Sequence, residues 1–274
     1  MTTIDVALAG LASIAGRLVG TFVLRPYVFG FLAFFLVAGL RDIGRIRTVG
    51  FLLWGGVVAL VAELVSTRVG IPFGLYHYTG ATRGLELFLG DVPFFSPLSF
   101  PFLAYASFCL ARWSLGPGWT TTRAGRARMV TVVGVLMMLL DVVIDPLAVR
   151  GGRWFLGHIF YYPEGGLYFG VPLSNFLGWL VVGWITAGGF VWALAPRGPA
   201  APGAPGPGIA LYYLVLGVNL SVTLWIGEQL IAVVGLVVHA GLFLLLYGVN
   251  RVTAGRWSAE SLSAPAMSGE GTGP

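Results

Sequence analysis

Three carboxylic acids lie inside apolar stretches of the sequence, where an ionisable group is costly and usually functional. Glu63 lies in VALVAELVS, and Asp141 and Asp145 lie in MMLLDVVIDPL. Their spacing of four residues places the two aspartates on one helix face. Two negative charges so close repel, so one carboxyl group can keep its proton beside an ionised neighbour, as general acid–base chemistry requires. We therefore predict that all three acids are catalytic.

Each acid also has a purely structural interpretation. Glu63 could pair with Arg68 or reach the nearby membrane interface, and Asp145 could cap the end of its helix. Capping explains Asp141 less well, because that residue lies one turn deeper in the helix.

Two loops, at residues 70–91 and 151–170, are rich in aromatic residues and glycine. Some of these rings would form an interfacial belt, but aromatic faces also stabilise cations. The residues predicted to bind substrate are Tyr76, His77, Tyr78, Trp154, Tyr168, Asn175 and Trp179. His77 and His158 lack the ligand spacing of a metal site, and the sequence carries no phosphate, dinucleotide, haem or zinc motif. We expect neither a metal nor a cofactor.

Membrane helices must position these residues. The chain of 274 residues is 57% hydrophobic and 10% charged, with a mean hydropathy of +0.87. This predicts an all-α, polytopic transmembrane helical bundle of about 7–8 spans in a lipid bilayer. The candidate spans are residues 6–23, 26–40, 49–66, 97–113, 129–147, 172–194, 209–226 and 229–248. The first two could instead form a hairpin, or one span plus an interfacial helix, because Arg17 interrupts the first and the second is short.

The distribution of arginine predicts the orientation of the bundle. The sequence has no lysine, and its arginines lie between the apolar stretches rather than in one basic stripe, which argues against nucleic-acid binding. One threading puts ten arginines on one side and five on the other, and the positive-inside rule then places both termini in the cytoplasm. We expect a multi-pass protein of the cell membrane.

Residues 1–257 are predicted to form a single transmembrane domain. Residues 196–208 (PRGPAAPGAPGPG) form a Pro/Gly-rich cytoplasmic linker within it, and residues 258–274 form a disordered tail.

A short internal repeat relates spans three and four to spans five and six. In each pair, a helix with acid near its far end precedes an aromatic loop, and each loop ends in Val-Pro, at 92–93 and 171–172. Duplicated membrane folds commonly hold their sites at the interface of the repeats.

Four motifs between Glu63 and Trp179 carry a resemblance to a known family. They are GIPFGLYHYT at 70–79, GDVP at 90–93, DVVIDP at 141–146 and YFGVPLSNFLGW at 168–179. They resemble the membrane carotenoid-biosynthesis proteins of the carotenoid 1,2-hydratase and bisanhydrobacterioruberin hydratase type. The resemblance implies addition of water to the terminal double bond of an acyclic (ψ) carotenoid end, without a redox cofactor. The resemblance is also compatible with contact between this protein and other enzymes of the carotenoid pathway.

Under this resemblance, Asp141 or Asp145 would protonate the alkene and Glu63 would activate water, although these roles could be exchanged. Aromatic faces would shield the cation. A carotenoid cyclase of the lycopene-cyclase type is one alternative, but the heterodimeric membrane cyclases carry acidic residues after a helix-opening proline, whereas Asn175 follows Pro172 here. A membrane prenyltransferase would need a second aspartate-rich motif. A carotenoid-binding or transport protein without turnover is a further alternative.

Overall fold

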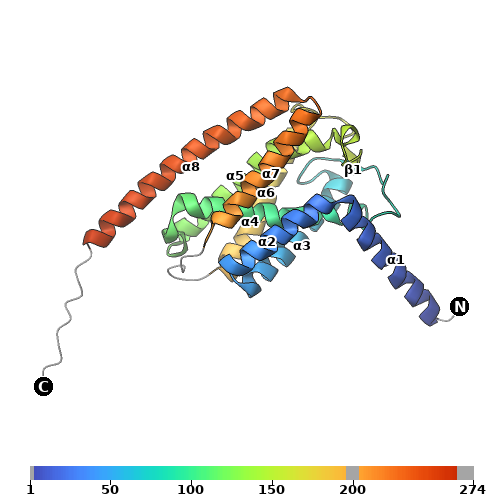
Figure 1. Cartoon of the computed structure of the whole chain (residues 1–274), viewed down its shortest axis with the longest axis horizontal. Helices are drawn as coiled ribbons and strands as arrows, with labels where there is room; N and C mark the ends of the chain where they lie inside the picture. Colours follow the sequence, from blue (N-terminus) through green and yellow to red (C-terminus); the bar gives the residue numbers. More distant parts are fainter. Residues whose placement is uncertain (1–2, 196–203, 264–274) are drawn as a thin grey trace, which may run out of the picture.

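The computed structural model describes residues 3–195 and 204–263, and in these ranges it is a bundle of α-helices (Figure 1). The helices are α1 (Thr3–Leu24), α2 (Pro26–Asp42), α3 (Arg45–Val69), α4 (Phe95–Leu115), α5 (Arg123–Ala148), α6 (Leu173–Gly189), α7 (Gly206–Trp225) and α8 (Gln229–Ser263). A π-helical turn, η3 (Phe190–Leu194), extends α6. This confirms a helical membrane fold.

Five of these segments are long and apolar enough to cross a membrane: α3, α5, α6 with η3, α7 and the first part of α8. A sixth candidate arises if the bent pair of α1 and α2 counts as one span. The predicted number of spans is therefore not confirmed.

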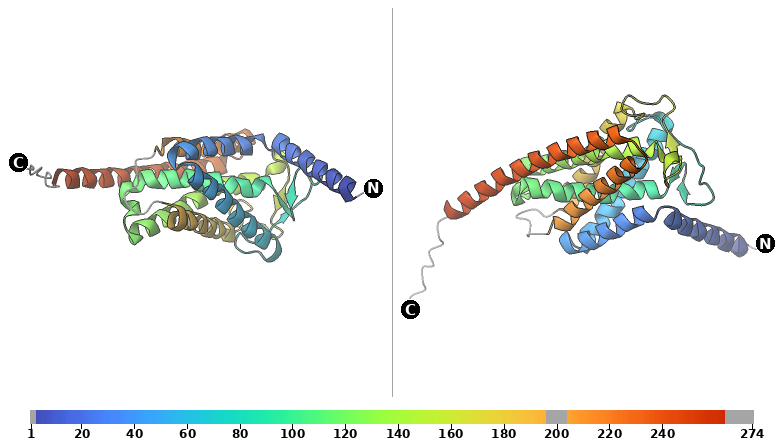
Figure 2. Two further views of the ribbon diagram at one scale, coloured as in Figure 1. Left: turned by 90° about the horizontal axis from the view of Figure 1, so that it is seen from below. Right: turned by 45° about the horizontal axis from the view of Figure 1, so that its top comes forward.

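Helix α4 lies at the centre of the bundle, in contact with α2, α3, α5, α7 and α8 (Figures 1 and 2). Most of its side chains are buried, including a run from Phe100 to Ala111. Its serines, its prolines and Arg112 make it less apolar than the candidate spans, and its contacts with other helices permit this composition.

The α1–α2 junction is an elbow of 90°, so the predicted hairpin of residues 6–23 and 26–40 is wrong. Pro26 has no backbone N–H to continue a helix, and it disfavours helical geometry at Arg25, which has φ −126°. The Arg25 guanidinium is buried and donates to both oxygens of Glu86, at 3.2 and 2.9 Å, and to the carbonyl of Leu156 at 2.7 Å. The elbow is thus attached to both loops, and α1 projects away from the bundle (Figure 1).

Short strands join the two aromatic loops. Strand β1 (His77–Tyr78) pairs antiparallel with β4 (Phe160–Tyr161), while β2 (Phe88–Leu89) and β3 (Val92–Pro93) form a hairpin inside the first loop. The short 3₁₀ helices η1 (Pro117–Thr120) and η2 (Gly151–Arg153) complete the described elements. The β1–β4 pair brings the two halves of the predicted repeat together.

Two further predictions concern chain segments outside the helical core. Residues 206–208 of the predicted linker form the first turn of α7, where a proline is tolerated, and residues 196–203 lie outside the described residues. Helix α8 continues to Ser263, so residues 258–263 of the predicted tail are helical, since no proline interrupts this helix. Residues 264–274 lie outside the described part of the chain.

Candidate active site

A cavity lies at the loop end of the bundle. Its walls come from α2 to α7 and from both aromatic loops, and most of the lining side chains are apolar. Its polar lining includes two acids, Glu63 and Asp145, which come from different halves of the repeat. Convergence of a few polar groups in an apolar cavity is typical of a small-molecule site.

Glu63, in the last third of α3, is buried with 2% of its surface exposed and accepts hydrogen bonds at both carboxylate oxygens. Tyr78 Oη donates to its Oε2 at 2.9 Å, and Ser96 Oγ donates to its Oε1 at 2.8 Å. Tyr78 comes from β1, and Ser96 comes from the first turn of α4. The alternative pairing with Arg68 is wrong, because Arg68 lies at the surface near Asp91.

Asp141 and Asp145 converge on one amide, as their spacing predicts. Asn175 Nδ2 donates to Asp141 Oδ2 at 2.6 Å and to Asp145 Oδ2 at 2.8 Å. Trp179 Nε1 lies 3.4 Å from the same Asp145 oxygen. Asp145 lines the cavity, whereas Asp141 lies behind it, fully buried, with its Oδ1 lacking a hydrogen-bond partner.

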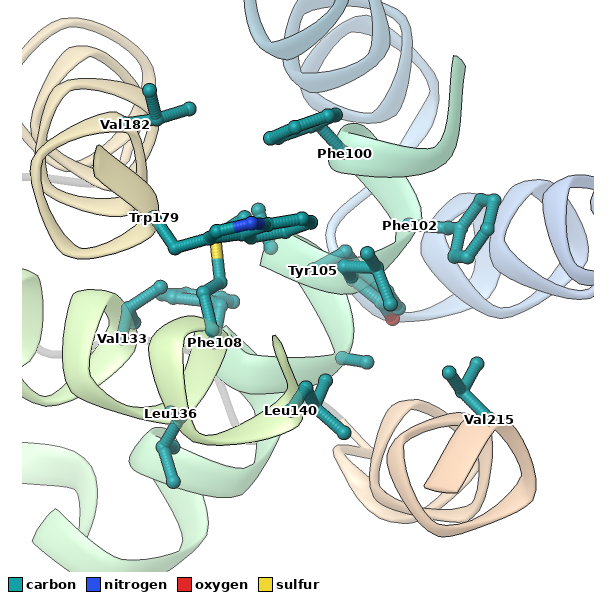
Figure 3. Close-up of a cluster of buried hydrophobic side chains, with 14 of the residues drawn as sticks. Phe100, Phe102, Tyr105, Phe108, Val133, Leu136, Leu140, Trp179, Val182 and Val215 are labelled. Carbon is teal, nitrogen blue, oxygen red and sulfur yellow. The ribbon is translucent and has the colours of Figure 1, made fainter. Parts of the chain in front are cut away.

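Aromatic rings form the remaining walls around the acids. The rings of Phe100 and Trp179 are stacked, with centroids 4.5 Å apart and planes at 10° (Figure 3). Tyr76 packs against both Tyr78 and Tyr162, with ring centroids 5.5 and 5.8 Å apart. Burial raises the pKa of all three tyrosines well above the usual value of a phenol, so each presents a neutral ring and hydroxyl group.

Not every predicted binding residue reaches the cavity. Tyr76, Tyr78, Trp154, Asn175 and Trp179 line it. His77 instead packs against Tyr161 in the β1–β4 pair, and the Tyr168 hydroxyl donates to the carbonyl of Val142 at 3.3 Å. Neither side chain belongs to the cavity lining, because strand alternation turns His77 away from Tyr78 and the β-bridge of Tyr168 with Val171 holds that ring beside α5.

Further residues that the sequence did not assign to substrate binding also line the cavity, among them Ser96, Phe100, Tyr162 and Asn219. The repeat contains a signal for two of them. When Pro93 is aligned with Pro172, Ser96 falls on Asn175 and Phe100 falls on Trp179. Within the described residues, no group of three or more His, Cys, Asp or Glu side chains could hold a metal ion.

The fold and the site together define a multi-pass α-helical membrane protein with an acid-containing apolar cavity. The profile of the family described as "Carotenoid biosynthesis protein" matches residues 21–245, so the chain belongs to this family. It is similar to bisanhydrobacterioruberin hydratase of Haloarcula japonica, with 32% identity over 234 residues that cover 82% of this chain and 75% of that protein. No solved structure matches.

Proposed function

We propose that this protein is a carotenoid hydratase that adds water across the terminal C1–C2 double bond of an acyclic carotenoid end, without a metal or redox cofactor. The observation that carries the proposal is that two differently built acid sites, at Glu63 and at Asp145, line one apolar cavity. The named relative is a hydratase of a carotenoid, which supports the same reaction class.

Asp145 is the proposed general acid. It lines the cavity, and it shares the amide of Asn175 with Asp141, so the pair is built to hold one proton between two carboxyl groups. Asp145 transfers this proton to C2 of the alkene, the less substituted carbon, and a tertiary cation forms at C1. Asp141 is a positioning residue that keeps the pair supplied with its proton.

Glu63 is the proposed general base. The hydroxyl groups of Tyr78 and Ser96 fix both oxygens of its carboxylate as acceptors. A water molecule attacks C1 and passes one proton to Glu63, leaving a tertiary alcohol. Return of that proton to the aspartate pair restores the site, so the net reaction consumes only the alkene and one water.

The stacked rings of Phe100 and Trp179, with the ring of Tyr76 in the same cavity, would stabilise the cation between these steps. Aromatic faces attract cations by about 0.5–2 kcal/mol each, depending on their solvation. An apolar wall also keeps stray water from the cation, so the outcome depends on the single positioned water.

The acid and base assignments can be separated by isotope labelling. In D₂O the wild-type product should carry one deuterium bound at C2, and H₂¹⁸O should supply the hydroxyl oxygen. Asp145→Asn should abolish both labels. Glu63→Gln should suppress ¹⁸O uptake but still allow deuterium to enter recovered substrate, because protonation is intact and the cation reverts by proton loss. The opposite pattern would exchange the two roles.

The same experiment tests the alternatives. A cyclase would return a product of unchanged mass with no ¹⁸O, because an internal alkene captures the cation. A carotenoid-binding protein would retain pigment without incorporating either label.

We also propose that the loops 70–91 and 151–170 lie outside the cytoplasm and that the C-terminus lies inside it, following the excess of arginine at the opposite end. The predicted cytoplasmic N-terminus depended on residues 6–23 crossing the membrane. Helix α1 meets α2 at 90°, so the side of the membrane on which the N-terminus lies needs its own measurement. Accessibility of single cysteines introduced at each end, in a chain lacking Cys109, would test this orientation.

A further inference from the structure

The depth of the acid site limits where a long substrate can lie. Glu63 is six residues from the end of α3 at Val69, which places it about 9 Å from the loop end of that helix. An acyclic carotenoid is a stiff rod of about the thickness of the hydrocarbon core, ~30 Å. Its polyene therefore cannot be contained between the acids and the loops.

The path toward the cytoplasmic end is filled by side chains. A cluster of aromatic rings, each with at most 1% of its surface exposed, packs there with centroids 4.7–6.4 Å apart. Its members are Phe35, Phe51, Tyr105, Phe108 and Phe190. Figure 3 shows Tyr105 near the stacked rings of Phe100 and Trp179, so this packed cluster lies next to the wall of the cavity.

The side of the bundle offers the remaining path. Helices α2 and α7 lie close together at the ends away from the aromatic loops and diverge toward the loops (Figures 1 and 2). Between them the cavity is lined by Tyr27 and Phe31 of α2 and by Val218 of α7, all partly exposed. Phe155, 58% exposed, meets Tyr27 edge-on at 5.6 Å on the loop side of this opening.

We propose that the cleft between α2 and α7 is a lateral portal, in which the polyene chain of the substrate lies while its end group reaches the acids. This inference rests on the proposed function and deepens it. The occupant is the polyene because the residues of α2 and α7 that line the cleft are mainly apolar and belong to the same cavity as Asp145 and Glu63.

The portal defines a substrate class. Only the ψ-end is enclosed by the cavity, so the enzyme recognises one end group while the far end of the carotenoid stays in the bilayer. Chain length and the structure of the far end should therefore matter little, and a carotenoid with two ψ-ends must leave and re-enter for its second hydration.

A blocking substitution and a matched control test this portal. Val218→Trp places a large ring in the cleft, whereas Leu214→Trp places the same ring one turn earlier on α7, at a 44% exposed position outside the cavity lining. In proteoliposomes with lycopene, we expect Val218→Trp to lower kcat/KM at least about tenfold and Leu214→Trp to change it less than about twofold. Equal effects of the two variants, in folded protein, would overturn the portal.

Two further measurements protect the test against misfolding of the blocked variant. A diazirine amino acid at position 218 should crosslink to lycopene, giving protein heavier by one substrate, and the same group at position 214 should not. Crosslinking at both positions or at neither would contradict the portal. Wild-type kcat/KM per ψ-end should also agree within about twofold for lycopene and monocyclic γ-carotene, and a tenfold preference would contradict it.

Failure of the proposed function has a different signature. Wild-type protein would then add no water to lycopene, whatever the crosslinking pattern. Hydration by the wild type without any selective effect at position 218 would refute the portal alone.

Discussion

Replacing Asp145 with asparagine tests the proposed acid with little change in shape. The amide fills the same volume and can present its oxygen to Asn175, so the hydrogen bond of 2.8 Å can be kept. It cannot deliver a proton to an alkene. Loss of a general acid typically costs about 10²–10⁴-fold in rate. The neighbouring Asp141 does not line the cavity and so cannot substitute directly. We expect a loss of about 10³-fold in kcat with little change in carotenoid binding.

The assay is conversion of lycopene in proteoliposomes, with the hydrated product quantified by mass and bound pigment by its visible absorption. Asp91→Asn is the matched control, because it makes the same chemical change at an acid whose side chain is 58% exposed. The activity of Asp141→Asn should lie between those of Asp145→Asn and Asp91→Asn, because this change removes the partner that shares the proton but keeps the acid that lines the cavity. Activity of Asp145→Asn within tenfold of wild type would refute the assignment.

Three stability predictions follow from contacts outside the acid site. Glu86→Gln removes one partner of the buried ion pair at the elbow and should lower the free energy of unfolding in detergent by about 3–5 kcal/mol. Asp91→Asn, in an exposed ion pair of the same loop, should lower it by at most about 1 kcal/mol. Gly183→Ala should destabilise the protein by about 1–3 kcal/mol, because the new Cβ would lie 2.7 Å from the α5 backbone. Gly188→Ala is its control and should be neutral or slightly stabilising, because the nearest atom to the new Cβ would lie 4.0 Å away. Burial raises the pKa of Glu228, but hydrogen bonds and charges from its two arginine partners outweigh burial and lower the pKa overall. The stabilisation by Glu228 should therefore be complete above the ordinary pKa of glutamate and should disappear as the pH falls through the lowered pKa. Thermal melts from pH 7 to pH 3 should show this acid-dependent loss in wild type and not in Glu228→Gln.

The features that depend on local sequence were predictable. Apolar stretches placed the membrane helices, and a spacing of four residues placed Asp141 and Asp145 on one face, where they meet Asn175. The two Val-Pro motifs marked where the loops return to helix. These features follow from helix periodicity and from proline geometry, both of which act over a few residues.

The features that depend on packing were not predictable. Nothing local to Arg25 indicates that it is buried against Glu86, 61 residues later, or that this pair accompanies an elbow between α1 and α2. Likewise, Ser96 looks like an ordinary helix-start serine until β1 brings Tyr78 beside it and both meet Glu63. Such contacts join segments whose proximity only the assembled bundle determines.

The repeat explains how one scaffold can supply both an acid and a base. Ser96 and Asn175 occupy equivalent positions three residues after the two Val-Pro prolines, and each donates to the carboxylate of the preceding helix. In the first half, hydroxyl groups hold a single carboxylate, which suits acceptance of a proton. In the second half, an amide holds two carboxylates, which suits sharing and donation of one.

Under the proposed function, the asymmetry of the reaction would follow from a small divergence between two similar halves. Phe100 and Trp179, also at equivalent positions, stack face to face between them. Both rings line the cavity that also holds Glu63 and Asp145. Exchanging Ser96 for Asn should therefore leave the fold intact while weakening the distinction between the two halves, and it should lower water capture, followed by ¹⁸O, more than protonation, followed by deuterium. Equal losses of both labels would show that the two halves do not divide the steps in this way.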